Sequence, residues 1–243
     1  CYAPPCHQLT DEVVPMFMIP YPSMVHWSRT YAGKEAPWAK VRSRPHLMSL
    51  IMEQRHKGIL RSGMLSWKLR AALWQACTGY GQQLCVAKLA SELTIKEIFD
   101  TYATSEFCLQ PQGDTCERKG ILDSILVGCI PVLFREKACP MDTLFHFHWG
   151  AWQKESVVFF KVSDVLKRTV DVKASLEAIP KEERDRKRAA IARFGRLLQY
   201  NVDDPLPEQD DALSWIFATI AEGKRHPLPY LPMRPGVDRY GSP

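Results

Sequence analysis

The sequence predicts an α/β protein in which helices cover both faces of a parallel β-sheet. Short apolar runs alternate with segments of helical periodicity, the pattern that parallel sheets produce. Residues 107–132 show it best: a strand ending at Pro111, a turn at Gly113, a helix over about 117–127 and a strand over 130–134. Since parallel strands need a crossover between them, this order predicts a βαβ unit whose helix begins at the carboxyl edge of the sheet.

The remaining elements are predicted from the same two periodicities. The expected strands are residues 46–52, 84–89 and 156–162. A helix is expected over 66–77, where Leu69 and Leu73 are one turn apart, and another over 95–102, with Thr94 as its N-cap. After Asp164 the pattern is helical, over about 171–178, 181–200 and 209–222.

These elements divide the chain into four parts. They are an interdomain linker segment, a sheet domain, a group of C-terminal helices and an extended tail, over residues 1–45, 46–165, 166–222 and 223–243.

Composition excludes several classes of protein. The 243 residues are 46% hydrophobic and 24% charged, which is ordinary for a globular chain. The net charge of +5 comes with no stripe of basic residues between aromatics, so no nucleic-acid partner is expected. No run of 18 apolar residues occurs, so we expect no membrane span in this chain.

The eight cysteines lack the paired Cys-x-x-Cys spacing of zinc sites. Cys108 and Cys129 fall in predicted core strands and are expected to be buried thiols. Cys1 with Cys6, and Cys77 with Cys85, flank turns and could form disulfides in a secretory compartment, although spacing does not fix the connectivity.

Arg118 and Lys119 stand in the first turn of the predicted helix 117–127. Cations there face the positive end of the helix dipole, which is unfavourable unless an anion lies among them. A phosphate would satisfy the helix N–H groups and both cations. Asp123, one turn later, could accept hydrogen bonds from ribose hydroxyls, so the pattern favours a nucleotide-diphosphate site. The alternative is an ordinary solvated helix face, with Asp123 as a surface acid.

Other sites have weaker support. Neither G-x-G-x-x-G nor a Walker loop occurs, so the sequence supports neither hydride transfer nor ATP hydrolysis. On a strand, His146 and His148 would share a face and could hold a metal, but without a third ligand we favour packing or a donor-pocket role. Trp149 could line a sugar pocket or the core.

The central motif is similar to the signature of the exostosin-like glycosyltransferases. The similarity rests on Leu109-Gln-Pro-Gln-Gly-Asp-Thr115, on the Arg118-Lys119 pair and on Asp123-Ser-Ile-Leu-Val-Gly-Cys-Ile-Pro-Val132. It most resembles the plant xyloglucan galactosyltransferase branch, which has a second arginine and a serine where this chain has Lys119 and Gly120. A weaker resemblance runs over residues 11–222 and includes Arg70, in a helix beside the nucleotide cleft.

The resemblance implies a Rossmann-like domain, the C-terminal, donor-binding half of a two-domain GT-B glycosyltransferase, followed by C-terminal helices. It implies inverting transfer of galactose or a related sugar from a UDP-sugar to a glycan acceptor, without a metal or other cofactor. The residues expected to bind the donor are Arg70, Gly113, Asp114, Thr115, Arg118, Lys119 and Asp123.

We assign no catalytic residue, because the resemblance implies a general base in an N-terminal domain outside this chain. It also implies the Golgi lumen as location, with a membrane anchor only in the parent protein. The alternative function is a nucleotide- or glycan-binding module without turnover.

Overall fold

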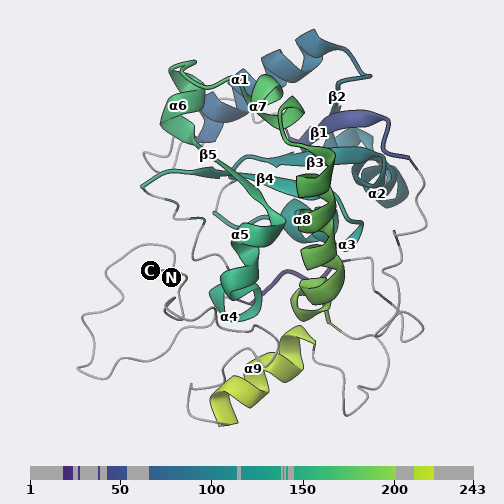
Figure 1. Ribbon diagram of the computed structural model, residues 1–243, viewed down its shortest axis with the longest axis vertical. Coiled ribbons are helices and arrows are strands. Elements are labelled where there is room, and N and C mark those ends of the chain that lie inside the picture. Colours follow the sequence, from purple (N-terminus) through teal and green to yellow (C-terminus); the bar gives the residue numbers. More distant parts are fainter. Residues whose placement is uncertain are drawn as a thin grey trace.

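The computed structural model describes residues 19–23, 27, 38, 43–53, 66–113, 116–137, 139, 141, 145–200 and 211–221. Five parallel strands form one sheet in the order β2-β1-β3-β4-β5 (Figure 1). The strands are β1 (His46–Met52), β2 (Cys85–Leu89), β3 (Ser105–Gln110), β4 (Ile130–Arg135) and β5 (Val158–Lys161). The predicted fold class, a Rossmann-like parallel sheet, is confirmed.

Helices connect the strands and continue after the last one. The α-helices are α1 (Ser66–Tyr80), α2 (Ile95–Ala103), α3 (Lys119–Leu126), α4 (His146–Trp149), α5 (Gln153–Ser156), α6 (Val162–Leu166), α7 (Val172–Glu177), α8 (Lys181–Phe194) and α9 (Ala212–Ala221). Short 3-10 turns are η4 (Ala90–Glu92), η6 (Gly150–Trp152) and η7 (Gly195–Leu198).

The predicted start of α2 is correct, and its cap explains why. The Thr94 side chain accepts a hydrogen bond from the Glu97 N–H, and the Glu97 carboxylate accepts one from the Thr94 N–H at 2.8 Å. This capping box satisfies two N–H groups that the first turn would otherwise leave without partners.

Helices cover both faces of the sheet because the side chains of each strand alternate between them. On β1, Met48 and Leu50 pack against α1, α6 and α7, whereas Ile51 points to the opposite face and packs near α2. On β4, Leu133 lies on that second face against α3 and α8. In Figure 1, α1, α6 and α7 lie above the sheet, and α3 and α8 below it.

The strand order reverses direction at β1. From β1 the chain passes through α1 to β2 on one side, then through α2 to β3 on the other. In open parallel sheets ligands bind outside the carboxyl ends of the strands at such a reversal, where the two crossovers diverge to opposite faces. In this sheet the position lies between the carboxyl ends of β1 and β3.

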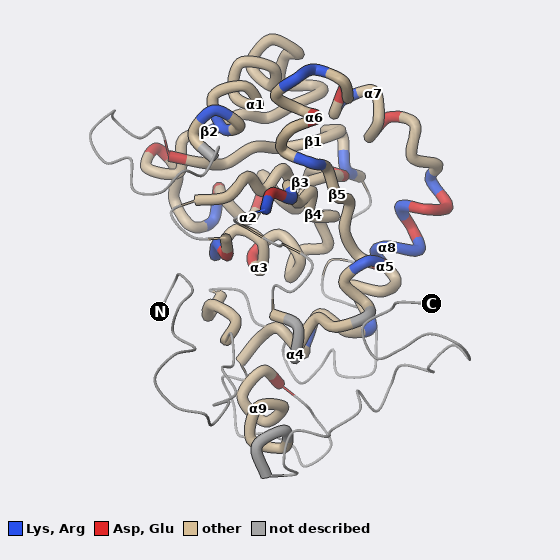
Figure 2. The backbone as a smooth tube through the Cα atoms, turned by 90° about the vertical axis from the view of Figure 1, so that its left-hand side faces the viewer, with Lys and Arg blue, Asp and Glu red and all other residues tan. Residues whose placement is uncertain are grey.

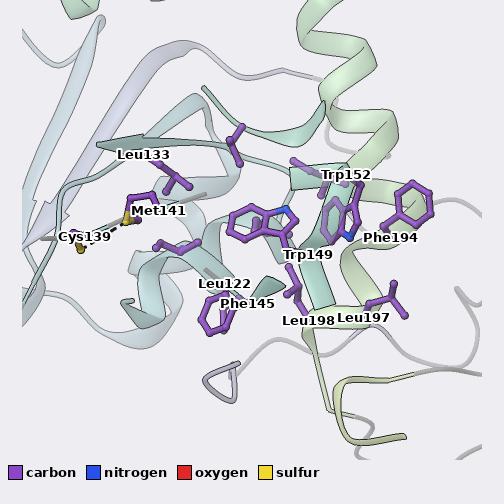
Figure 3. Packing of buried hydrophobic residues seen from close by; sticks show 14 residues of the cluster. Leu122, Leu133, Cys139, Met141, Phe145, Trp149, Trp152, Phe194, Leu197 and Leu198 are labelled. Carbon is purple, nitrogen blue, oxygen red and sulfur yellow. Dashed lines mark hydrogen bonds between the residues drawn. The ribbon is translucent and has the colours of Figure 1, made fainter. Parts of the chain in front are cut away.

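Below the sheet, a core of large side chains joins it to the C-terminal helices. Trp149 and Trp152 have ring centroids 5.8 Å apart, and Trp152 lies 5.6 Å from Phe194 of α8 (Figure 3). Both indoles are buried and donate hydrogen bonds, Trp149 to Ser156 Oγ and Trp152 to the His148 carbonyl, each at 2.9 Å. Trp149 is therefore a core residue, not the lining of a sugar pocket.

The metal alternative for His146 and His148 required a strand, whereas these residues form the helical turn α4. Residues two apart on a helix do not share a face as they do on a strand, so the arrangement considered for a metal pair is not the one this turn provides. His148 is buried with Nε2 3.0 Å from the Ala212 carbonyl oxygen, which ties α4 to α9. The favoured packing role is the one that the structure supports for His148.

Three disulfides cross-link the described part of the chain. Cys77–Cys85 joins α1 to β2, as the sequence allowed. Cys108 and Cys129 are not free thiols as predicted, because they form a disulfide between β3 and the residue before β4. The third bond joins Cys116 and Cys139. Cys1 and Cys6 lie outside the described residues.

Gly128, at the turn between α3 and β4, has a positive φ of 73° that favours glycine. A Cβ at this position would also lie 2.4 Å from the indole of Trp38. The tight α3–β4 connection therefore depends on this glycine.

Charge is distributed unevenly over the helices. Figure 2 shows basic and acidic residues alternating along α8, while the sheet itself is largely uncharged. Within the described residues, no helix has both the length and the apolar character that crossing a bilayer requires. The predicted linker, the tail and the domain boundaries stay predictions, since most of residues 1–45 and all of 222–243 lie outside the described part.

Candidate functional site

Two arginines bind backbone carbonyls at the carboxyl end of β1, on the side of the strand-order reversal. Arg118 donates from Nη2 to the Ile51 carbonyl at 2.8 Å and from Nη1 to the Pro111 carbonyl at 3.0 Å. Arg70, in the second turn of α1, donates to the Glu53 carbonyl. Because Ile51 belongs to β1 and Pro111 follows β3, the Arg118 guanidinium spans the position at which ligands bind in such sheets.

Arg118 is a desolvated cation. Burial lowers the pKa of its guanidinium, and among the described residues no carboxylate forms an ion pair with it. Its two carbonyl partners satisfy hydrogen bonds but neutralise no charge. A buried cation that is hydrogen-bonded but not paired is costly, and a bound anion would remove that cost.

The geometry corrects the predicted conflict between Arg118 and the helix dipole. The helix begins at Lys119, two residues later than expected, and Arg118 is its N-cap, with extended backbone angles (φ −149°, ψ 146°). Its side chain extends to the carbonyls of residues 51 and 111, which stabilise its charge. No cap hydrogen bond comes from the Arg118 side chain, and the first turn contains no acid.

Lys119 and Asp123 form an ion pair across one turn of α3. Lys119 Nζ lies 2.7 Å from Asp123 Oδ2 and 2.9 Å from Oδ1, and it also lies 5.8 Å from the centroid of the Phe99 ring. The Lys119 side chain is 46% exposed, whereas that of Asp123 is only 6% exposed. The lysine can therefore reach a ligand in solvent while remaining close to its carboxylate.

Asp123 is buried, so the interpretation of it as a surface acid is wrong. Its Oδ1 accepts a second hydrogen bond from Ser23 Oγ at 2.6 Å. Ser23 belongs to residues 19–23, which the Tyr200 hydroxyl also anchors through the Pro20 carbonyl at 2.9 Å. A ribose hydroxyl would have to share the carboxylate with Ser23 or replace it.

The turn between β3 and α3 is only partly described. Gly113 is half-buried, and a Cβ added there would meet no atom within 4 Å. Packing alone therefore does not require glycine at this position, which leaves room beside the turn. Asp114 and Thr115, both predicted to bind the donor, lie outside the described residues.

The structure thus brings Arg118, Lys119 and Asp123 together at the start of α3 and places Arg70 beside the end of the neighbouring strand β1. Three groups that the sequence did not predict also belong to this region. They are Ser23 and two buried polar side chains beneath α3, Tyr102 and Gln110. The Ser23 contact joins segments 100 residues apart, and the Gln110 contact with Gly120 depends on how α3 packs on β3, so periodicity indicates neither.

Chemically, the arrangement is suited to an anion. Two cations and the N–H groups at the start of α3 lie at a ligand-binding edge, and a carboxylate follows one turn later. Among the described residues, no three His, Cys, Asp or Glu side chains gather in a way that could hold a metal ion.

Comparison with known proteins gives a consistent result. Residues 13–170 match the model of the Exostosin GT47 domain. The chain is 41% identical over 87 residues to the Probable xyloglucan galactosyltransferase GT19 of Arabidopsis thaliana, a match covering 36% of this chain and 20% of that protein. A Xyloglucan-specific galacturonosyltransferase 1 from the same plant is 33% identical over 98 residues, 40% of this chain and 14% of the relative.

A longer match reaches the Probable xyloglucan galactosyltransferase GT12 of Arabidopsis thaliana. It is 29% identical over 220 residues, which are 86% of this chain and 41% of that protein. The chain therefore spans less than half the length of each of these relatives.

Proposed function

The chain belongs to the Exostosin GT47 family, and from this premise we propose that it is the donor-binding half of a glycosyltransferase. Its substrate would be a nucleotide sugar, a UDP-sugar carrying galactose or a related sugar, and a glycan would be the acceptor. The names of the relatives include both galactosyl and galacturonosyl transfer, so the choice of sugar is left at this class.

The observation that carries the proposal is the buried guanidinium of Arg118 at the strand-order reversal, which forms no ion pair with a carboxylate of the described residues. A diphosphate seated at the start of α3 would neutralise it, accept hydrogen bonds from the helix N–H groups and lie within reach of the half-exposed Lys119. Arg70, held beside the end of β1, would supply a third cation.

The same groups would assist departure of the nucleotide. In direct displacement at the anomeric carbon, which inverts the configuration, negative charge develops on the leaving diphosphate. Preorganised donors and cations that meet this charge lower the barrier. Fixed cations of this kind do the work of a metal ion, so we propose a metal-independent reaction. The general base that accepts the proton of the acceptor hydroxyl is assigned to no residue of this chain.

The disulfides support an oxidising compartment. Cross-links of this kind are rare in the cytosol, and this chain has three among its described residues. We propose the Golgi lumen, with attachment to the membrane through a part of the parent protein outside this chain.

Calorimetric titration of the 243-residue chain with UDP and with uridine, in EDTA, tests the proposal. Replacing Lys119 with Gln should weaken the binding of UDP about tenfold, which is the lower end of the range for a hydrogen bond to a charged group. The affinity for uridine should not change. Lys96→Gln is the matched control, because Lys96 forms the same one-turn pair with Asp100 on the exposed surface of α2.

Asp123→Ala should separate ribose from phosphate contacts. Since both ligands carry the ribose, the variant should bind both more weakly, by between a few-fold and a hundredfold. Equal losses of UDP and uridine in Lys119→Gln would contradict the phosphate clamp. UDP binding that strictly requires manganese would contradict the metal-independent mechanism, and no binding of UDP under any condition would refute the proposed function.

A further inference from the structure

A buried polar pair lies directly beneath the first turn of α3. Tyr102, from the end of α2, is 1% exposed, and Gln110, the last residue of β3, is fully buried. Burying a phenol and a carboxamide among apolar side chains is unfavourable unless their polar atoms find partners. What these atoms face is therefore informative.

The two polar ends converge at Gly120. A Cβ at position 120 would lie 2.9 Å from Gln110 Oε1, 2.9 Å from the Tyr102 hydroxyl and 3.5 Å from Arg118 Nη2. The glycine thus leaves a space into which three polar groups from α2, β3 and the start of α3 project. The Tyr102 hydroxyl and Arg118 Nη2 thus border the same space, the one that a side chain at position 120 would occupy.

The hydrogen bonds within this group are incomplete. Gln110 Nε2 donates to the Gly120 carbonyl at 3.0 Å and so fixes the orientation of the amide. Gln110 Oε1, although buried, has no hydrogen-bond partner among the described residues. An unsatisfied buried acceptor lowers stability, and small movements that satisfy it are favoured.

We propose that Tyr102 and Gln110 are positioning residues that orient Arg118 towards a bound diphosphate. When the anion draws the guanidinium towards the α3 N-terminus, Arg118 donates to the Tyr102 oxygen and the Tyr102 hydroxyl donates to Gln110 Oε1. Gln110 Nε2 remains bound to the Gly120 carbonyl, so the chain of hydrogen bonds ends on the helix that binds the phosphate. The inference rests on the proposed function and adds residues to the same site.

The test is a double-mutant cycle between Tyr102→Phe and Gly120→Ser, read by titration with UDP and with uridine. Tyr102→Phe removes one oxygen atom from a buried ring and should weaken the binding of UDP about two- to tenfold. The affinity for uridine should not change. Gly120→Ser alone should cost more, because its Cβ displaces the Tyr102 hydroxyl and Arg118. In the double variant the serine hydroxyl can occupy the vacated space, so UDP affinity should recover relative to Gly120→Ser.

The possible results distinguish the positioning role from the proposed function. If the native chain binds UDP and Tyr102→Phe binds it equally well, the positioning role is refuted and the proposed function stands. If the losses in UDP affinity from the two substitutions simply add, the two positions do not share one space, and the inference is likewise refuted. If the native chain does not bind UDP, the proposed function fails and the inference with it.

Thermal unfolding of the same variants without ligand is the control for a damaged fold. Tyr102→Phe should unfold cooperatively near the native temperature, so that its loss of UDP affinity cannot come from a damaged fold. Equal weakening of UDP and uridine in this variant would indicate general damage to the pocket and would overturn the inference.

Discussion

Replacing Arg118 with Met should destabilise the free protein, although the helix dipole alone predicts the opposite. A cation next to a helix N-terminus is unfavourable by about 0.3–1 kcal/mol, so its removal would raise stability by that amount. The structure adds two hydrogen bonds, at 2.8 and 3.0 Å, to carbonyls that the variant would leave without this donor. Hydrogen bonds to a charged group contribute about 1.5–3 kcal/mol each.

The two effects can be compared directly. The lost hydrogen bonds outweigh the relief of the dipole and of the desolvated charge, so the net loss should be about 2–4 kcal/mol. For a chain of this size, 1 kcal/mol corresponds to about 2–4 °C, which predicts a fall in Tm of about 4–16 °C. Differential scanning calorimetry without ligand measures it, with Lys96→Met, whose pair with Asp100 is exposed, as the control expected to stay within about 1 kcal/mol.

An unchanged or higher Tm in Arg118→Met would refute this reasoning. It would mean that the hydrogen bonds to the Ile51 and Pro111 carbonyls add nothing to stability and that the guanidinium acts only in ligand binding. A fall in Tm combined with loss of UDP binding, in contrast, is the signature of a residue that both ties two strand ends together and carries the ligand charge.

Two further predictions concern the scaffold. Replacing both Cys108 and Cys129 with Ala should lower the free energy of unfolding by about 2–5 kcal/mol in urea. Because this bond closes a span of 21 residues against 8 for the α1–β2 disulfide, its removal should cost about 1 kcal/mol more; an equal or smaller loss would contradict the loop-entropy account. Gly128→Ala should destabilise by more than about 2 kcal/mol, through positive φ and overlap with an indole. Gly79→Ala, in open space near the end of α1, should instead be neutral or stabilising by up to about 1 kcal/mol, and similar melting of both variants would contradict the packing argument.

The elements were predictable because their signals are local. The capping box at Thr94 and the continuous apolar run of residues 130–134 lie within a few residues of the structure they determine. The turn α4 was missed because its aromatic residues suit a strand as well as a helix, and its helical form depends on packing against α9 and η7. Periodicity also placed the start of α3 two residues too early. The side chain of Arg118 bonds to distant carbonyls, and its backbone is extended, so the helix begins only at Lys119.

The site was predictable in its residue types but not in its partners. Arg118, Lys119 and Asp123 follow from the turn before α3, yet the carbonyl of Ile51 is 67 residues from Arg118, and Ser23 is 100 residues from Asp123. The Cys108–Cys129 disulfide was missed for the same reason, because it depends on the register of β3 against β4. The sequence thus indicated which charged residues gather at the edge of the sheet. Only the fold shows that Arg118 joins the ends of two strands and that Asp123 is buried.

The attachment of residues 19–23 has a consequence for biosynthesis. Ser23 is held by Asp123, and Pro20 by Tyr200, which follows it in the chain by 180 residues. At about 5–20 residues per second, the ribosome needs roughly 10–40 s between making Pro20 and making Tyr200. During that interval residues 19–23, whose Ile19 and Tyr21 stay exposed even in the final fold, lack the Tyr200 hydroxyl that holds Pro20. Chaperones that meet the nascent chain would therefore find a target at residues 19–23 until Tyr200 has been made.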